Sequence, residues 1–173
     1  MTKAKPLPPA EVIRAEFNYD PATGHLSYAK PRQSVNAGQE VISSNVAVKP
    51  SGQRYVRTRV IWCWMTGEDP GEFLIDHKNG NNTDDRWENL RKATPQQNMY
   101  NRRGFGRYPK GVSFLKTNIN KPWRAVIMNN GESIRLGYFA TMKEACKAYE
   151  VAEKKVHGDF SVKLRPQQKA AQL

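Results

Sequence analysis

Asp76 and His77 place a carboxylate beside an imidazole where a short apolar run, residues 73–75, meets a polar loop over residues 78–85. Hydrolysis of a phosphodiester near neutral pH needs a base that activates water and a cation that stabilises charge on the phosphate and the leaving oxygen. The imidazole can be the base, and the carboxylate can hold the cation. Because adjacent strand residues point to opposite faces, the two can share a site only if the strand ends or bulges there, which the loop rich in Asn and Gly favours.

A helix is expected over residues 94–103, because it opens with a Thr of N-cap type followed by a Pro. The spacing of three to four residues puts Asn98 on one helix face with Arg102, and that face can close over Asp76. Read singly, Asn98 could equally be a solvated helix position, and Asn89 a simple loop or cap residue.

Taken together, three segments at fixed spacings strongly resemble HNH endonucleases of the phage homing type; they span residues 75–81, 85–91 and 94–102. The resemblance implies a beta-beta-alpha metal fold in which His77 is the general base and Asn89 braces the loop that orients it. It also implies that Asp76 and Asn98 hold one divalent cation on the scissile phosphate. Oxygen ligands of this kind suit Mg²⁺ or Mn²⁺ rather than Zn²⁺. The departure from the pattern is Asn98, which stands in place of the last His.

The residues before this segment are expected to form short elements. A helix is predicted over residues 11–17, a hairpin over residues 18–28, and strands over residues 41–48 and 54–60. One face of the last strand, with Arg57 and Arg59, could touch phosphate. A short buried helix is predicted over residues 60–65.

The C-terminal half carries most of the net charge of +12. Residues 1–100 hold 13 basic and 11 acidic side chains, whereas residues 101–173 hold 15 and 5. This imbalance favours a polyanionic partner, with nucleic acid first and an acidic membrane surface second, over a surface that is merely kept soluble by its charge.

Three short strands and an amphipathic helix at residues 141–157 are predicted in this half. The motifs at residues 110–112, 123–127, 134–139, 141–149 and 157–158 resemble the Apetala-type, or ethylene-response-factor-like, DNA-binding domain. The resemblance implies a three-stranded sheet that rests on the helix and sets its outer face in the major groove. Fewer Arg and Trp side chains stand on that face than in the plant pattern, so contacts with phosphate are the safer expectation. The DNA contacts expected here and at the end of the preceding helix are Lys110, Arg124, Arg135, Arg102 and Arg103.

The sequence therefore predicts an α+β protein with a nuclease domain over residues 1–103, a linker over 104–109, a DNA-binding domain over 110–165 and a disordered tail over 166–173. Cys63 and Cys146 lack the spacing of a zinc site or a disulfide framework. No apolar run is long enough for a bilayer, so we expect a cytoplasmic monomer that binds double-stranded DNA, with no membrane contact and no protein partner implied. The alternative is a DNA-binding regulator whose nuclease site is degenerate.

Overall fold

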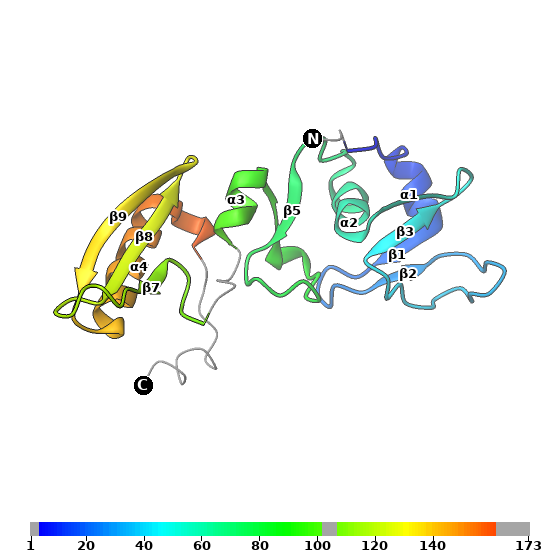
Figure 1. Ribbon diagram of the computed structural model, residues 1–173. Helices are drawn as coiled ribbons and strands as arrows, with labels where there is room; N and C mark the ends of the chain where they lie inside the picture. The colour runs from blue at the N-terminus through cyan, green and yellow to red at the C-terminus, as the bar shows by residue number, and fades with distance from the viewer. Residues whose placement is uncertain (1–3, 102–106, 162–173) are drawn as a thin grey trace. The chain divides into compact units, whose positions relative to one another are not determined.

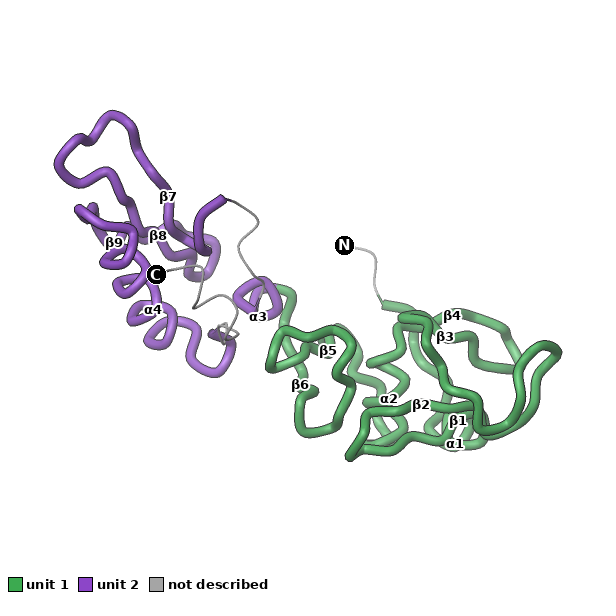
Figure 2. The backbone as a smooth tube through the Cα atoms, turned by 90° about the horizontal axis from the view of Figure 1, so that it is seen from below, with its two compact units in different colours: residues 1–95 green, residues 96–173 purple. Residues whose placement is uncertain are grey.

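The computed structural model describes residues 4–101 and 107–161, which form two compact units. Unit 1 covers residues 1–95 and unit 2 covers residues 96–173, coloured green and purple in Figure 2. Both combine helices with small antiparallel sheets, which confirms the predicted α+β class. The predicted domain limits, 1–103 and 110–165, stay predictions, and the tail at 166–173 lies outside the described residues. Across the described ranges, no helix is both long and apolar enough to pass through a bilayer.

Unit 1 begins with helix α1 (Ala10–Glu16) and the predicted hairpin of β1 (Phe17–Tyr19) and β2 (Leu26–Tyr28). A second hairpin pairs β3 (Asn45–Val48) with β4 (Gln53–Val56). Buried and exposed side chains alternate along β1 and β4, as expected for strands with one face on the core. The largest fully buried side chains of this unit are Ile13, Phe17, Leu26, Val46, Val48, Val60, Ile61 and Cys63.

Helix α2 (Arg57–Thr66) starts earlier than predicted. The strand expected to run to Val60 ends at Val56. Residues 58–61 are all buried, whereas a strand with one face on the core would bury only every second residue, and they form part of the helix. The prediction that Arg57 and Arg59 lie on a strand face that touches phosphate is therefore wrong. Arg57 and Arg59 lie on this helix, where they pair with the carboxylates of Asp85 and Asp69.

The HNH-like segment forms the rest of unit 1. Strand β5 (Leu74–His77) pairs antiparallel with β6 (Leu90–Ala93), and a polar loop and the one-turn helix η1 (Trp87–Asn89) connect them. The register places Asp76 opposite Arg91 and His77 opposite Leu90. Helix α3 (Pro95–Tyr100), labelled in Figure 1, follows β6 in the chain. It begins at the expected Pro, which is the last residue of unit 1.

Unit 2 holds a sheet in the order β7-β8-β9, made of β7 (Val112–Phe114), β8 (Trp123–Asn129) and β9 (Glu132–Phe139). Helix α4 (Met142–His157) packs on one face of it, and the turn η2 (Gly158–Phe160) follows. The cap of α4 is a reciprocal pair: the Thr141 side chain accepts from the Glu144 N–H, while the Glu144 carboxylate accepts from the Thr141 N–H. The core residues are Val112, Ala125, Ile127, Ala145 and Tyr149.

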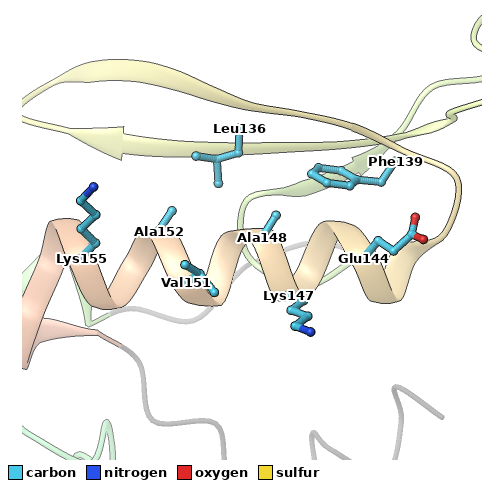
Figure 3. Close-up of a pocket in the computed structure, with 8 residues that line it drawn as sticks. All are labelled: Leu136, Phe139, Glu144, Lys147, Ala148, Val151, Ala152 and Lys155. Atoms are coloured by element: carbon cyan, nitrogen blue, oxygen red, sulfur yellow. The ribbon is translucent and has the colours of Figure 1, made fainter.

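A shallow apolar groove lies between β9 and α4 in unit 2 (Figure 3). Leu136 and Phe139 form its sheet side, and Ala148, Val151 and Ala152 form its helix side. Ile134 is 40% exposed. It lies on β9, an edge strand of this sheet, where only one neighbouring strand covers it.

Candidate active site

The imidazole of His77 is held by a buried carboxylate at the end of strand β5. Its Nε2 lies 2.7 Å from Oδ1 of Asp85, and the Asp85 side chain is only 4% exposed. The other carboxylate oxygen of Asp85 lies 2.6 Å from a terminal nitrogen of Arg57, at the start of α2. An ionised carboxylate is costly to bury unless it is paired and hydrogen-bonded, and here both of its oxygens have partners. Helix α2 and the loop after β5 thus converge on His77.

The first hairpin supports the backbone of Asp85. The Tyr19 hydroxyl donates to the Asp85 carbonyl at 2.6 Å, and the Trp87 N–H donates to the Pro21 carbonyl at 3.1 Å. Burial and the nearby Asp85 charge raise the pKa of Tyr19, so this hydroxyl keeps its proton. Gly24 sits so close that a Cβ there would lie 2.6 Å from the Arg86 nitrogen. Segments far apart in sequence therefore fix the position of one loop carboxylate.

Asp76 makes a different ion pair. Its Oδ2 accepts from Arg91 Nε at 2.9 Å and lies 2.7 Å from a terminal nitrogen of the same guanidinium. This follows from the register, in which the two residues face each other across β5 and β6. Asp76 is buried, and β5 ends at the next residue, His77, as a shared site would require.

Asn89 ties the two ends of the polar loop together. Its Oδ1 accepts from the Asn79 N–H at 3.0 Å, and its Nδ2 donates to Asn79 Oδ1 at 3.1 Å and to the Asp84 carbonyl at 2.7 Å. The Asn89 carbonyl accepts from the Lys78 N–H at 2.8 Å. These contacts are those of a buried structural brace, and the bracing role in catalysis remains a prediction.

Asp84 fixes the far side of this loop. Two nitrogens of Arg86 donate to its two oxygens, each at 2.8 Å, and Asn79 Nδ2 donates to Oδ2 at 2.7 Å. The hydrogen bonds from Arg86 are the main cause that lowers the pKa of Asp84 to about 2. Asp84 therefore stays ionised at neutral pH and serves the loop rather than proton transfer.

Asn98 lies on α3, in the part of this helix that belongs to unit 2. Within unit 2, the Tyr100 ring stacks on His157 with centroids 3.8 Å apart, and the Tyr100 hydroxyl accepts from the Asn130 N–H at 3.0 Å. These contacts anchor the end of the helix that carries Asn98. A meeting of Asn98 with Asp76 stays a prediction.

The oxygen donors predicted for a cation fit a hard ion by their chemistry. A carboxylate and a side-chain amide are typical Mg²⁺ ligands, with water and phosphate oxygens filling the other positions. Among residues 4–101 and 107–161, no group of three or more His, Cys, Asp and Glu side chains is arranged to hold a metal. HNH nucleases generally use a divalent metal.

The predicted DNA contacts have different environments. Arg124 Nε donates to Ser113 Oγ at 3.2 Å, and Arg135 donates to the Tyr138 hydroxyl at 3.1 Å. Arg124 pairs across the strands with Ser113 and Tyr138, so these three share one face of the sheet. Lys110 instead donates to the Tyr100 carbonyl and lies 3.4 Å from Glu153, and burial lowers its pKa. Arg102 and Arg103 lie outside the described residues.

Sequence reasoning missed Asp85, Arg57 and Arg91. Asp85 lies inside the motif, but its neighbour Asp84 is chemically identical, and only the fold tells which of the two reaches His77. The sequence places Arg57 on a strand, so its ion pair with Asp85 is not expected from the pattern. The pairing of Arg91 with Asp76 could have been found from the β5 and β6 register, since directly opposed residues of opposite charge interact.

Comparison with known proteins gives two matches. Residues 55–100 match the family model described as HNH endonuclease. A protein of Acanthamoeba polyphaga mimivirus, named an uncharacterized HNH endonuclease, is 28% identical over 108 residues, which are 62% of this chain and 54% of that protein. The chain thus spans about half the length of this relative. No solved structure matches the chain.

These matches bear on the two resemblances differently. Neither supports the Apetala-type resemblance, which stays a prediction. The matched segment contains Arg57, Asp76, His77, Asp85, Asn89 and Asn98. It bears out the HNH endonuclease class expected from the sequence, through a match to the family model over residues 55–100.

Proposed function

We propose that the protein is a metal-dependent endonuclease of the homing type that hydrolyses phosphodiester bonds in double-stranded DNA. The observation that carries this proposal is His77, an imidazole inside the HNH-matched segment whose Nε2 is bonded to a buried carboxylate. A histidine held in this way is oriented to take a proton from water. The viral relative supports a phage or viral origin, and the proposal includes a cytoplasmic monomer without a protein partner.

In this proposal the residues of unit 1 have separate tasks. His77 takes the proton of the attacking water, and Asn89 holds the loop that fixes His77 through its bonds to Asn79 and Asp84. Asp76 and Asn98 hold the cation, Mg²⁺ or Mn²⁺. When bound, the cation stabilises the charge that develops on the scissile phosphate and on the leaving oxygen.

Unit 2 binds the DNA in this proposal. The Apetala-type resemblance and the shared sheet face of Arg124, Ser113 and Tyr138 support contacts with the duplex backbone. Arg135, Arg102 and Arg103 extend this set. Lys110 is its weakest member, because its ammonium is already bound to Glu153 and to the Tyr100 carbonyl.

The proposal is tested by the substitution His77→Ala. Nicking and linearisation of a supercoiled plasmid are measured with Mg²⁺ or Mn²⁺, and DNA affinity is measured separately. Loss of a general base is expected to slow cleavage by about 10² to 10⁴-fold, while the dissociation constant for DNA changes little. His25→Ala is the matched control, since His25 is exposed and lies 3.9 Å from Glu40, outside the matched segment.

The second candidate is a DNA-binding regulator with a degenerate site. Two observations favour it: the Asp76 carboxylate is engaged by Arg91, and Asn98 stands in place of the last His of the motif. A wild-type protein that binds DNA but cuts no phage or host DNA with either metal would establish this candidate and refute the nuclease. If cleavage is seen, sequencing the fragment ends from a phage-genome digest gives the target site and shows whether both strands are cut.

A further inference from the structure

The contact between Asp85 and His77 assigns a role to a residue outside the proposed catalytic set. We propose that Asp85, fixed by Arg57, is the positioning residue that orients the His77 ring and leaves Nδ1 as the nitrogen that accepts the proton. This inference deepens the proposed function and rests on His77 being the base. It concerns which atom of His77 works and what holds the ring in place.

The geometry of the hydrogen bond carries the first step. Asp85 Oδ1 lies 2.7 Å from His77 Nε2, and an ionised carboxylate can only accept. Nε2 must therefore carry the hydrogen, so the lone pair of the neutral ring is on Nδ1. The His77 side chain is 13% exposed and that of Asp85 is 4% exposed, so water competes weakly for this bond.

Arg57 carries the second step. A carboxylate with a single partner could turn about its bond to the chain, but Arg57 lies 2.6 Å from Oδ2 and leaves Oδ1 toward the imidazole. Arg57 also donates to the carbonyls of Val41 and Ile42 at 3.1 and 3.2 Å, so its guanidinium is fixed in turn. The three side chains form a chain of contacts from α2 to the ring.

The pair of Asp85 and Arg57 differs from an ion pair that serves the fold alone. Asp69 and Arg59 form the same kind of pair in unit 1, also at 2.6 Å, and the second Asp69 oxygen accepts from the Leu7 N–H rather than from an imidazole. Asp85 differs in that its second oxygen serves His77. The pair of Asp69 and Arg59 is therefore the control that isolates the effect of the histidine contact.

The tautomer is measured directly, without metal or DNA. Long-range proton–nitrogen correlation spectra of the full-length protein, recorded over a range of pH, report which ring nitrogen carries the hydrogen. The chain has three histidines, so the His77 signals are identified by their absence from His77→Ala. We expect hydrogen on Nε2 in the wild type and in Asp69→Asn, and a mixture of both tautomers in Asp85→Ala.

Cleavage kinetics provide the second measurement. Single-turnover nicking in Asp85→Ala is expected to slow by about 10 to 100-fold, the size of effect seen when carboxylates that orient metal-bound histidines are removed, with the DNA dissociation constant unchanged. Asp85→Asn offers one acceptor oxygen to two donors, so an amide that gives its oxygen to Arg57 turns its NH2 group toward Nε2 and favours hydrogen on Nδ1; this variant is expected to cleave at least as slowly as Asp85→Ala. Asp69→Asn is expected to cleave at the wild-type rate, and circular dichroism verifies that each variant is folded.

Two results would overturn the inference: hydrogen on Nδ1 in the wild type, or an unchanged tautomer and cleavage rate in folded Asp85→Ala. If Asp85→Ala does not fold, the wild-type spectrum alone still tests the inference, because it shows which ring nitrogen carries the hydrogen. A protein that never cleaves DNA refutes the proposed nuclease, and the spectra still decide whether Asp85 sets the tautomer. The two failures are thus distinguishable.

Discussion

Three carboxylates in and beside the polar loop each have their own arginine, and this division is the main feature of the site at the scale of single residues. Asp76 is bound by Arg91, Asp84 by Arg86, and Asp85 by Arg57. Because each negative charge is matched locally, three acids can lie close in sequence without a large repulsive cost. The Asp85 pair also engages the imidazole of His77.

Asp84 gives a prediction for stability against pH. Its folded-state pKa is lowered from 3.8 to about 2, chiefly by the hydrogen bonds from Arg86. A lowered pKa means that this contribution to the free energy of unfolding is fully present above the unfolded value and is lost as the pH falls through the folded value. The stability advantage of wild type over Asp84→Asn should therefore be constant near neutral pH and shrink between about pH 4 and pH 2.

Urea unfolding of both proteins at a series of pH values measures this advantage. Asp20→Asn gives the comparison for a carboxylate held within an exposed turn: the hydrogen bonds from Thr23 and Ala22 lower the pKa of Asp20, so its own stability advantage should also shrink at acid pH. An advantage that persists unchanged at pH 2 would show that the ionised state of Asp84 contributes nothing.

At the scale of elements, the sequence predicted the parts whose signals are local. The hairpin of β1 and β2 and the helix α4 appear where composition and spacing put them. These signals depend on a turn residue, a cap or a periodic face within a few positions. The prediction of a strand up to Val60 is wrong because it rested on a short alternation of polar and apolar residues. In such a short segment, packing against the rest of the fold decides between strand and helix.

The candidate site was predictable in part for the same reason. His77 and Asn89 are marked by motif spacing, whereas the partner of His77 is set by the meeting of α2, the loop and the first hairpin. No pattern within the loop distinguishes Asp85 from Asp84. Contacts between segments far apart in sequence, such as that of Tyr19 with Asp85, become visible only in the folded structure.

The contact between the first hairpin and the loop can be tested at Gly24. Gly24 has a φ of +83°, and an added Cβ would lie 2.6 Å from the Arg86 nitrogen and 2.7 Å from the Asp85 carbonyl carbon. Gly24→Ala is expected to cost about 1–2 kcal/mol from backbone strain and about 1–3 kcal/mol more from the collision. Chemical denaturation measures the total.

Gly38→Ala is the matched control for Gly24. Gly38 has a φ of +81° and nothing within 4 Å of an added Cβ, so this variant carries the strain without the collision. The difference between the two variants isolates the contact with the loop. Equal losses in both would mean that the hairpin does not support Asp85.

At the scale of the whole molecule, charge separates the two halves of the chain. Residues 101–173 carry 15 basic and 5 acidic side chains, against 13 and 11 in residues 1–100. Within unit 1, several of the arginines are already matched by carboxylates, as the pairs of Arg57, Arg59 and Arg91 show. An excess of positive charge draws a polyanion mainly through the release of its counterions, so the proposed DNA binding should weaken steeply with salt.

This expectation becomes specific at Arg124 and Arg135. If each neutralises one phosphate, Arg124→Ala and Arg135→Ala each reduce the slope of log affinity against log salt concentration by about 0.9, and do so alike on unrelated duplex sequences. Lys143→Ala is the control, because it removes one exposed positive charge from α4, which packs on the opposite face of the sheet. Affinity is measured by fluorescence anisotropy over a range of salt concentrations. A slope that stays at the wild-type value removes that arginine from the interface, and a slope lowered equally by Lys143→Ala would mean that binding depends on total charge rather than on this face.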